Sequence, residues 1–139
     1  MSGELRARLE DLVGGFEPGE EFVALLYSLE REAPKEDIAI QEPELEHLVM
    51  RLARGRLPML FTDRRVIVFE VDPDDRPSGI VAQIPSTVVR VARIKKRTRF
   101  TKASVVLRIG SVDLQLDLGS DEHENLDLLA RSQYVFSNN

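Results

Sequence analysis

Two segments of alternating side chains near the C-terminal end constrain the fold of this 139-residue chain more than any other feature. In the later segment Asp113, Gln115 and Asp117 separate apolar residues at every second position, which are Val112, Leu114, Leu116 and Leu118. In the earlier segment the alternating apolar residues are Val105, Leu107 and Ile109. A period of two is typical of half-buried strands, and the two-residue link Gly110-Ser111 predicts an antiparallel hairpin.

Shorter patterns predict the other strands and the helices. Apolar, β-rich runs predict strands over residues 22–29, 57–62, 65–71, 80–84 and 88–96. Asp63-Arg64 is the expected turn between the second and third of these strands, and the turn-forming residues of 72–79 predict a loop. Helical spacing of apolar residues predicts an N-terminal helix within residues 1–15, a helix inserted within residues 31–56, and a helix after Ser120 with Leu126, Leu129 and Ala130 on its apolar face.

The order of these elements predicts the fold class. The length fits a single domain over residues 1–139. Strands at short, regular spacing predict a sandwich or barrel, so we expect a mainly β protein with helices (α+β). The closing amphipathic helix needs an apolar partner, most simply the open end of that barrel.

Several short motifs resemble those of GRAM and bacterial pleckstrin-homology-like (PH-like) domains. They are Gly19-Glu20, Gly55-Arg56-Leu57, the run Leu60-Phe61-Thr62-Asp63-Arg64-Arg65-Val66-Ile67-Val68-Phe69, and Ile84-Pro85 followed by Val88-Val89-Arg90-Val91. The resemblance extends over about residues 17–135. It implies a bent, seven-stranded antiparallel sheet or partly open barrel capped by a C-terminal helix, with the N-terminal helix and the helix between strands one and two as additions. It also implies binding of phosphoinositides, other anionic lipids, peptides or partner domains.

Composition and missing motifs argue against several kinds of chemistry. The chain has no cysteine, which excludes a disulfide framework, a thiolate zinc site and a cysteine nucleophile. His47 and His123 are its two histidines, and no H-E-x-x-H, G-x-S-x-G or glycine-rich phosphate loop is present. We therefore expect no metal, no cofactor and no catalytic residues, with an unrecognised hydrolase as the alternative. No signal peptide or membrane-spanning run is evident, which predicts a cytoplasmic protein, either free or peripheral to a membrane.

The charge of the chain is unevenly distributed. Residues 76–112 contain no Asp or Glu and carry a charge of +9, whereas the rest of the chain carries −14. Most of this charge lies in the basic segment 93–102, whose predicted binding residues are Arg93, Lys95, Lys96, Arg97, Arg99, Phe100 and Lys102. Charges at positions 93, 95, 97 and 99 would share one face of an extended strand. Arg51, Arg54 and Arg56 form a secondary candidate group.

Two explanations of the basic segment remain open. It either contacts an external anion, or it has an internal role, which is to protect an edge strand from pairing or to neutralise the protein's own carboxylates. The leading prediction is a non-catalytic binding module that acts as a protein–protein interaction or adaptor domain. Peripheral binding to anionic lipid through residues 93–102 is the second prediction. Nucleic acid is not an expected partner because the −14 outside the segment repels phosphates. Self-association into a homo-oligomer is left open.

Overall fold

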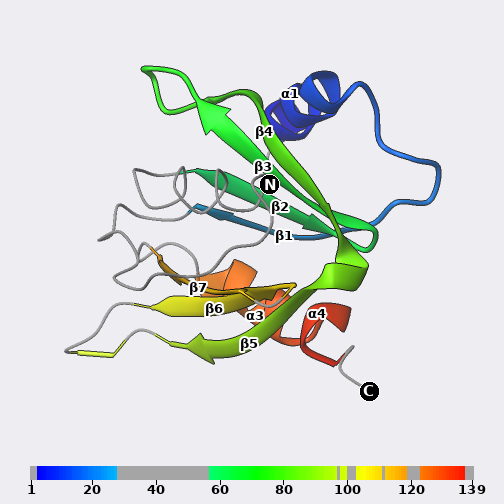
Figure 1. The fold of residues 1–139 in the computed structure, drawn as a ribbon. Helices are drawn as coiled ribbons and strands as arrows, with labels where there is room; N and C mark the ends of the chain where they lie inside the picture. Colours follow the sequence, from blue (N-terminus) through cyan, green and yellow to red (C-terminus); the bar gives the residue numbers. More distant parts are fainter. Residues whose placement is uncertain are drawn as a thin grey trace.

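A computed structural model of the chain describes residues 3–27, 57–96, 98–99, 103–110, 112–118 and 123–136. The first sheet has the order β1-β2-β3-β4 and consists of β1 (Phe22–Tyr27), β2 (Pro58–Thr62), β3 (Arg65–Val71) and β4 (Pro77–Pro85). The second sheet has the order β5-β6-β7 and consists of β5 (Val89–Lys95), β6 (Ser104–Ile109) and β7 (Val112–Asp117). Within the described residues, these antiparallel sheets confirm a mainly β protein with helices and do not join into a closed barrel (Figure 1).

The two predicted hairpins are confirmed. In the hairpin β6–β7, Ile109 pairs with Val112, and Gly110 has a φ of +61°, a conformation that glycine adopts without steric cost. In the hairpin β2–β3, Phe61 pairs with Val66, so the chain turns at the expected Asp63-Arg64.

The hairpin β3–β4 is longer than predicted. β4 begins at Pro77, where the sequence predicts that the loop continues to residue 79. Asp72 closes a tighter turn, because its side chain accepts hydrogen bonds from the amides of Asp74 and Arg76 at 2.9 Å each. Pro77 has no N–H to donate, but β4 is an edge strand of its sheet, where proline is tolerated at the first position.

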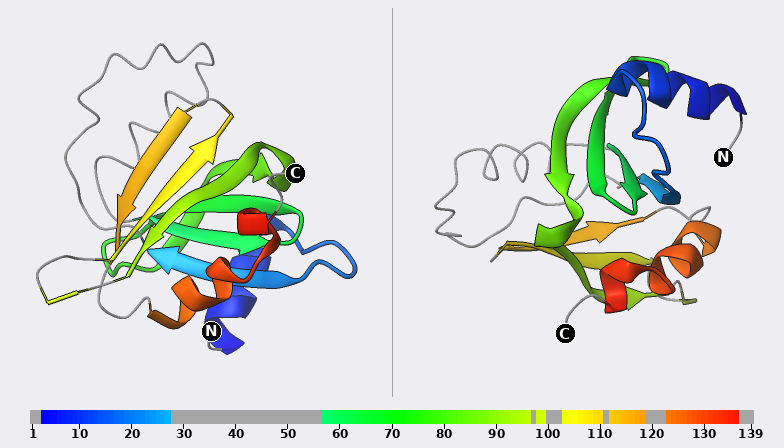
Figure 2. Two further views of the ribbon diagram at one scale, coloured as in Figure 1. Left: turned by 90° about the horizontal axis from the view of Figure 1, so that it is seen from below. Right: turned by 90° about the vertical axis from the view of Figure 1, so that its right-hand side faces the viewer.

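An N-terminal helix, α1 (Gly3–Val13), covers the outer face of the first sheet, on the side away from the second sheet (Figure 2). Its fully buried Leu9 packs in a cluster with sheet residues Leu25, Leu60, Ile67 and Phe69. The helix ends at Gly14 and Gly15, both of which have positive φ. The first sheet therefore has a cover on both of its faces, and every residue of β2 is buried.

The main core lies between the inner faces of the two sheets and continues into the C-terminal helices. The predicted single closing helix is two helices, α3 (His123–Ala130) and α4 (Gln133–Phe136). Ser132 separates them: its hydroxyl donates to the carbonyl of Leu129 at 2.6 Å and accepts from the amide of Tyr134 at 3.2 Å. α3 lies against β1 and α4 against β5, so the pair contacts both sheets. The predicted insertion over residues 31–56 lies outside the described residues.

Candidate binding surface

The outer face of the second sheet carries opposite charges on its two edges. Alternate residues of its strands, such as Val91, Leu107 and Leu114, are buried in the main core, and the residues between them face outward. The pairing of β5 with β6 and of β6 with β7 arranges the residues of this face in three rows, which are Arg90–Arg108–Asp113, Arg93–Val106–Gln115 and Lys95–Ser104–Asp117. Ser104, in the middle of the third row, is buried. The β5 edge of this face is therefore basic, and the β7 edge is acidic.

A β-bulge in β5 brings three cations onto the same face. Val91 pairs with Leu107 and Arg93 pairs with the next residue, Val106, so Ala92 is an extra residue in β5. Without the bulge, strict alternation would place Arg90 and Arg93 on opposite faces. Arg90, Arg93 and Lys95, all exposed, are called the basic stripe below. The β-bulge is also visible in the sequence, because the apolar residues change from an odd position at Val91 to an even position at Ile94.

The predicted basic residues do not form one continuous surface on the strand. β5 ends at Lys95, so the predicted strand face shared as far as residue 99 is too long, and only Arg93 and Lys95 share it. Lys96 turns to helix α3, where its Nζ lies 3.2 Å from Oδ1 of Asp127. Arg99 is exposed beyond the end of the strand. The other predicted residues fall outside the described part of the chain, namely Arg97, Phe100, Lys102, Arg51, Arg54 and Arg56.

The protein's own carboxylates neutralise some of these cations and not others. Arg108 binds Asp113 through two hydrogen bonds, Nε to Oδ1 at 2.8 Å and Nη2 to Oδ2 at 3.2 Å. This hydrogen bonding lowers the pKa of Asp113 and raises that of Arg108. Within the described ranges, the three cations of the basic stripe take part in no ion pair. In the part of the chain that the structure describes, carboxylates therefore neutralise Lys96 and Arg108 but not the cations of the stripe.

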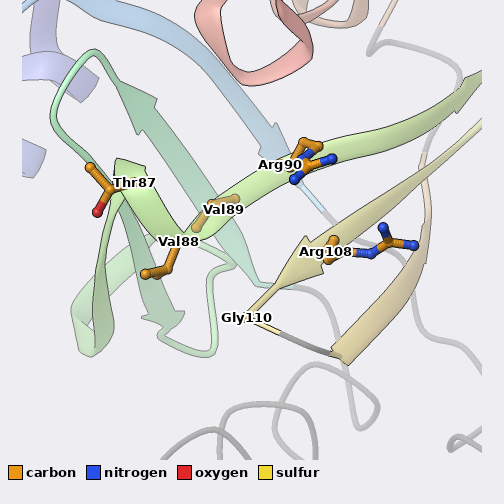
Figure 3. A pocket seen from close by; sticks show the side chains of 6 residues that line it. All are labelled: Thr87, Val88, Val89, Arg90, Arg108 and Gly110. Atoms are coloured by element: carbon orange, nitrogen blue, oxygen red, sulfur yellow. The ribbon is translucent and has the colours of Figure 1, made fainter. Parts of the chain in front are cut away.

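A pocket of 280 Å³ opens where β5 begins. It lies at the junction between a short 3-10 helix, η1 (Ser86–Val88), and β5, next to the end of β6. Its lining residues are Thr87, Val88, Val89, Arg90, Arg108 and Gly110 (Figure 3). The amide of Gly110 donates to the carbonyl of Val88 at 2.9 Å, which holds the β6–β7 turn against the start of β5. Sequence analysis did not assign Arg90 or Arg108 to a site, because their proximity arises from the pairing of two strands.

A second ionic cluster is buried and internally satisfied. The side chain of Glu20 is fully buried, and Arg65 donates to it from Nε and Nη2 at 3.0 Å each. The hydroxyl of Thr62 at 2.7 Å and the amide of Glu17 at 3.0 Å complete its hydrogen bonds. Burial alone would raise the pKa of Glu20, but these hydrogen bonds outweigh it and lower the pKa to about 2.

Tyr134 joins this cluster to helix α4. Its hydroxyl donates to the carbonyl of Thr62 at 2.5 Å, its ring contacts Phe61 edge to face, and burial raises its pKa. The Thr-Asp-Arg-Arg motif therefore has a structural role, because Thr62 and Arg65 hold the start of β1, the β2–β3 turn and α4 together.

Neither the described residues nor comparisons with known proteins point to a metal site, a membrane-spanning helix or a family. No group of three or more His, Cys, Asp or Glu side chains in the described ranges could hold a metal ion. No helix among these residues is long and apolar enough to cross a membrane. No family model, curated protein or solved structure matches the chain.

Proposed function

We propose that this chain is a non-catalytic binding module that contacts an acidic protein partner through the basic stripe. The observation that carries the proposal is the presence of three exposed cations on one strand face with no ion pair among the described residues. Like charges held side by side on a strand repel one another, and an acidic partner would offset that repulsion. Such a surface contributes to the rate and specificity of association more than to affinity.

The charge pattern favours a protein partner over a membrane. Asp113 and Asp117 lie two strands away from the stripe on the same outer face, and the side chain of Asp113 is 51% exposed. An anionic membrane resting on this face would meet these carboxylates as well as the cations. A protein partner can instead present acidic groups opposite β5 and leave the β7 edge uncovered.

A PH-like or GRAM-like fold is part of the same proposal. It is supported by a four-stranded and a three-stranded antiparallel sheet that follow each other along the chain, and by C-terminal helices that contact both sheets. The fully hydrogen-bonded Glu20 supports a structural role for the main buried ionic cluster rather than a catalytic role.

The test reverses two charges of the stripe in the variant Arg93→Glu/Lys95→Glu. Binding of the full chain is measured to immobilised poly-L-glutamate and to vesicles of phosphatidylcholine with phosphatidylserine, each at low and high salt. We expect the variant to bind poly-L-glutamate at least about tenfold more weakly and with a shallower salt dependence, because two attractive charges become repulsive. We expect its thermal midpoint to stay near that of the wild type.

Lys96→Glu is a control that reverses one neighbouring charge outside the stripe, since Lys96 already pairs with Asp127. This variant should lose stability and bind poly-L-glutamate more like the wild type than the double variant does. Tight binding of the wild type to vesicles, with none to poly-L-glutamate, would favour the lipid alternative. A double variant that binds both probes as the wild type does would show that the stripe is not a contact surface.

A further inference from the structure

We infer that the pocket at the start of β5 is a binding site for a carboxylate carried on a small apolar body. The inference goes beyond the proposed function, because it concerns a cavity that shares only Arg90 with the basic stripe and does not require the acidic protein partner. Arg90 and Arg108 pair directly across β5 and β6, which places their Cβ atoms about 4.5–5.5 Å apart on one face. Figure 3 shows the two side chains rising from adjacent strands at this pocket.

Both arginines have N–H groups that can donate hydrogen bonds to a ligand. Asp113 accepts hydrogen bonds from Nε and Nη2 of Arg108, which leaves Nη1 of that guanidinium available. Arg90 forms no ion pair among the described residues, so its planar guanidinium group can bind a carboxylate through two parallel hydrogen bonds. Asp113 thus holds Arg108 in place beside Arg90 without neutralising Arg90.

The charge of the site selects a monoanion. Two guanidinium groups and the single carboxylate of Asp113 leave one net positive charge on this row of the sheet. A monoanion neutralises that charge, whereas a dianion such as phosphate would leave an excess negative charge close to Asp113. The lining therefore favours a carboxylate over a phosphate group.

The other lining residues indicate what carries the carboxylate. Val88 is 46% exposed and lines the pocket, and among the described residues Leu128 is the other exposed large apolar residue. Thr87 belongs to the same lining. A volume of 280 Å³ is close to the lower end of the range for small-molecule pockets, about 300–1,000 Å³. A short branched apolar group attached to the carboxylate could contact Val88 while the arginines bind the charge.

The experiment titrates the ¹⁵N-labelled full chain with sodium isobutyrate and follows its amide signals by NMR. Isobutyramide, which has the same shape and no charge, is the first control, and inorganic phosphate is the second. A peptide acid ending in valine, N-acetyl-Gly-Gly-Val, distinguishes a chain end from a free small acid as the source of the carboxylate. We expect saturable shifts at Thr87–Arg90 and Gly110 with isobutyrate or with the peptide acid, and markedly weaker responses to isobutyramide and phosphate.

Two variants assign the effect to the pocket. Arg90→Gln should weaken binding about tenfold, the size expected for loss of one charge-assisted contact. Arg76→Gln removes one positive charge from the β3–β4 turn, outside the pocket and the stripe, and should bind as the wild type does, which would exclude a general effect of charge. Equal responses to isobutyrate and isobutyramide, no loss in Arg90→Gln, or shifts that never saturate would each overturn the inference.

Discussion

At the scale of single residues, the most perturbed carboxyl group of the described chain is Glu20. A buried carboxylate is costly unless it is paired and hydrogen-bonded, and Glu20 meets this condition through Arg65, Thr62 and the amide of Glu17. The pKa of Glu20 is thereby lowered from 4.5 to about 2. The ionised form is consequently the one that stabilises the folded protein.

The pH dependence of stability follows from this lowered pKa. The stabilisation is complete above pH 4.5, the ordinary pKa, and is lost as the pH falls through that value toward about 2. In this pH window Glu20 binds a proton more readily in the unfolded chain than in the folded one. The free energy of unfolding therefore decreases as the pH decreases. The variant Glu20→Gln should be less stable than the wild type near neutral pH, and the difference should narrow by about 2 kcal/mol between about pH 6 and about pH 3.

Urea unfolding of both proteins at the two pH values measures this difference. Comparison with Glu20→Gln cancels the contributions of other carboxyl groups, including Asp72 and Asp113, whose pKa values are also lowered. A difference that stayed constant with pH would contradict the structural role of the Glu20 carboxylate.

At the scale of elements, α3 offers two adjacent leucines in opposite environments. Leu129 is fully buried in the main core, whereas Leu128 is 43% exposed. Helical periodicity alone separates the two side chains by about 100° around the helix axis. Their substitution therefore tests whether α3 is an essential cover for the core.

We expect Leu129→Ala to lower the free energy of unfolding by about 2–5 kcal/mol, because it removes buried methyl groups and leaves a cavity. Leu128→Ala should change it by no more than about 0.5 kcal/mol, as is usual for exposed positions. Chemical denaturation monitored by circular dichroism gives both values. Equal losses in the two variants would show that α3 does not pack as described.

At the scale of the whole molecule, the described part of the chain is layered, with α1 and the second sheet on opposite sides of the first sheet (Figure 2). The outer cluster of Leu25, Leu60, Ile67 and Phe69 depends on α1 for its cover. A large exposed apolar patch promotes association with other molecules. The N-terminal helix is consequently part of the fold and not an accessory to it.

A chain that begins at Phe16 tests this conclusion. We expect it to bind the dye ANS and to self-associate, because removal of α1 exposes the apolar outer face of the first sheet. ANS fluorescence and light scattering measure these effects, with the full chain as reference. A truncated chain that remained monomeric, did not bind ANS and unfolded cooperatively would show that α1 is dispensable.

Local sequence patterns were sufficient to predict much of this architecture. The alternation around Gly110-Ser111 predicted the hairpin β6–β7, and the Asp63-Arg64 turn predicted the hairpin β2–β3. These predictions succeeded because burial of one face of a strand imposes a period of two on consecutive residues. Such a pattern can be recognised within a short stretch of sequence. Arg93 and Lys95 could be chosen from the sequence in the same way, since both follow the alternation of one strand.

Local patterns in the sequence are therefore enough to predict most strands, the mainly β class and the position of the basic segment. They do not predict that α1 covers the first sheet, that Arg65 binds Glu20, or that Arg108 lies opposite Arg90, all of which the folded chain shows. The tertiary structure also places Arg90 on the face of Arg93, through one extra residue at Ala92. These relations depend on which surfaces from distant parts of the chain come into contact and in which register. The periodicity of one segment shows which of its residues are buried but not which other segment covers them.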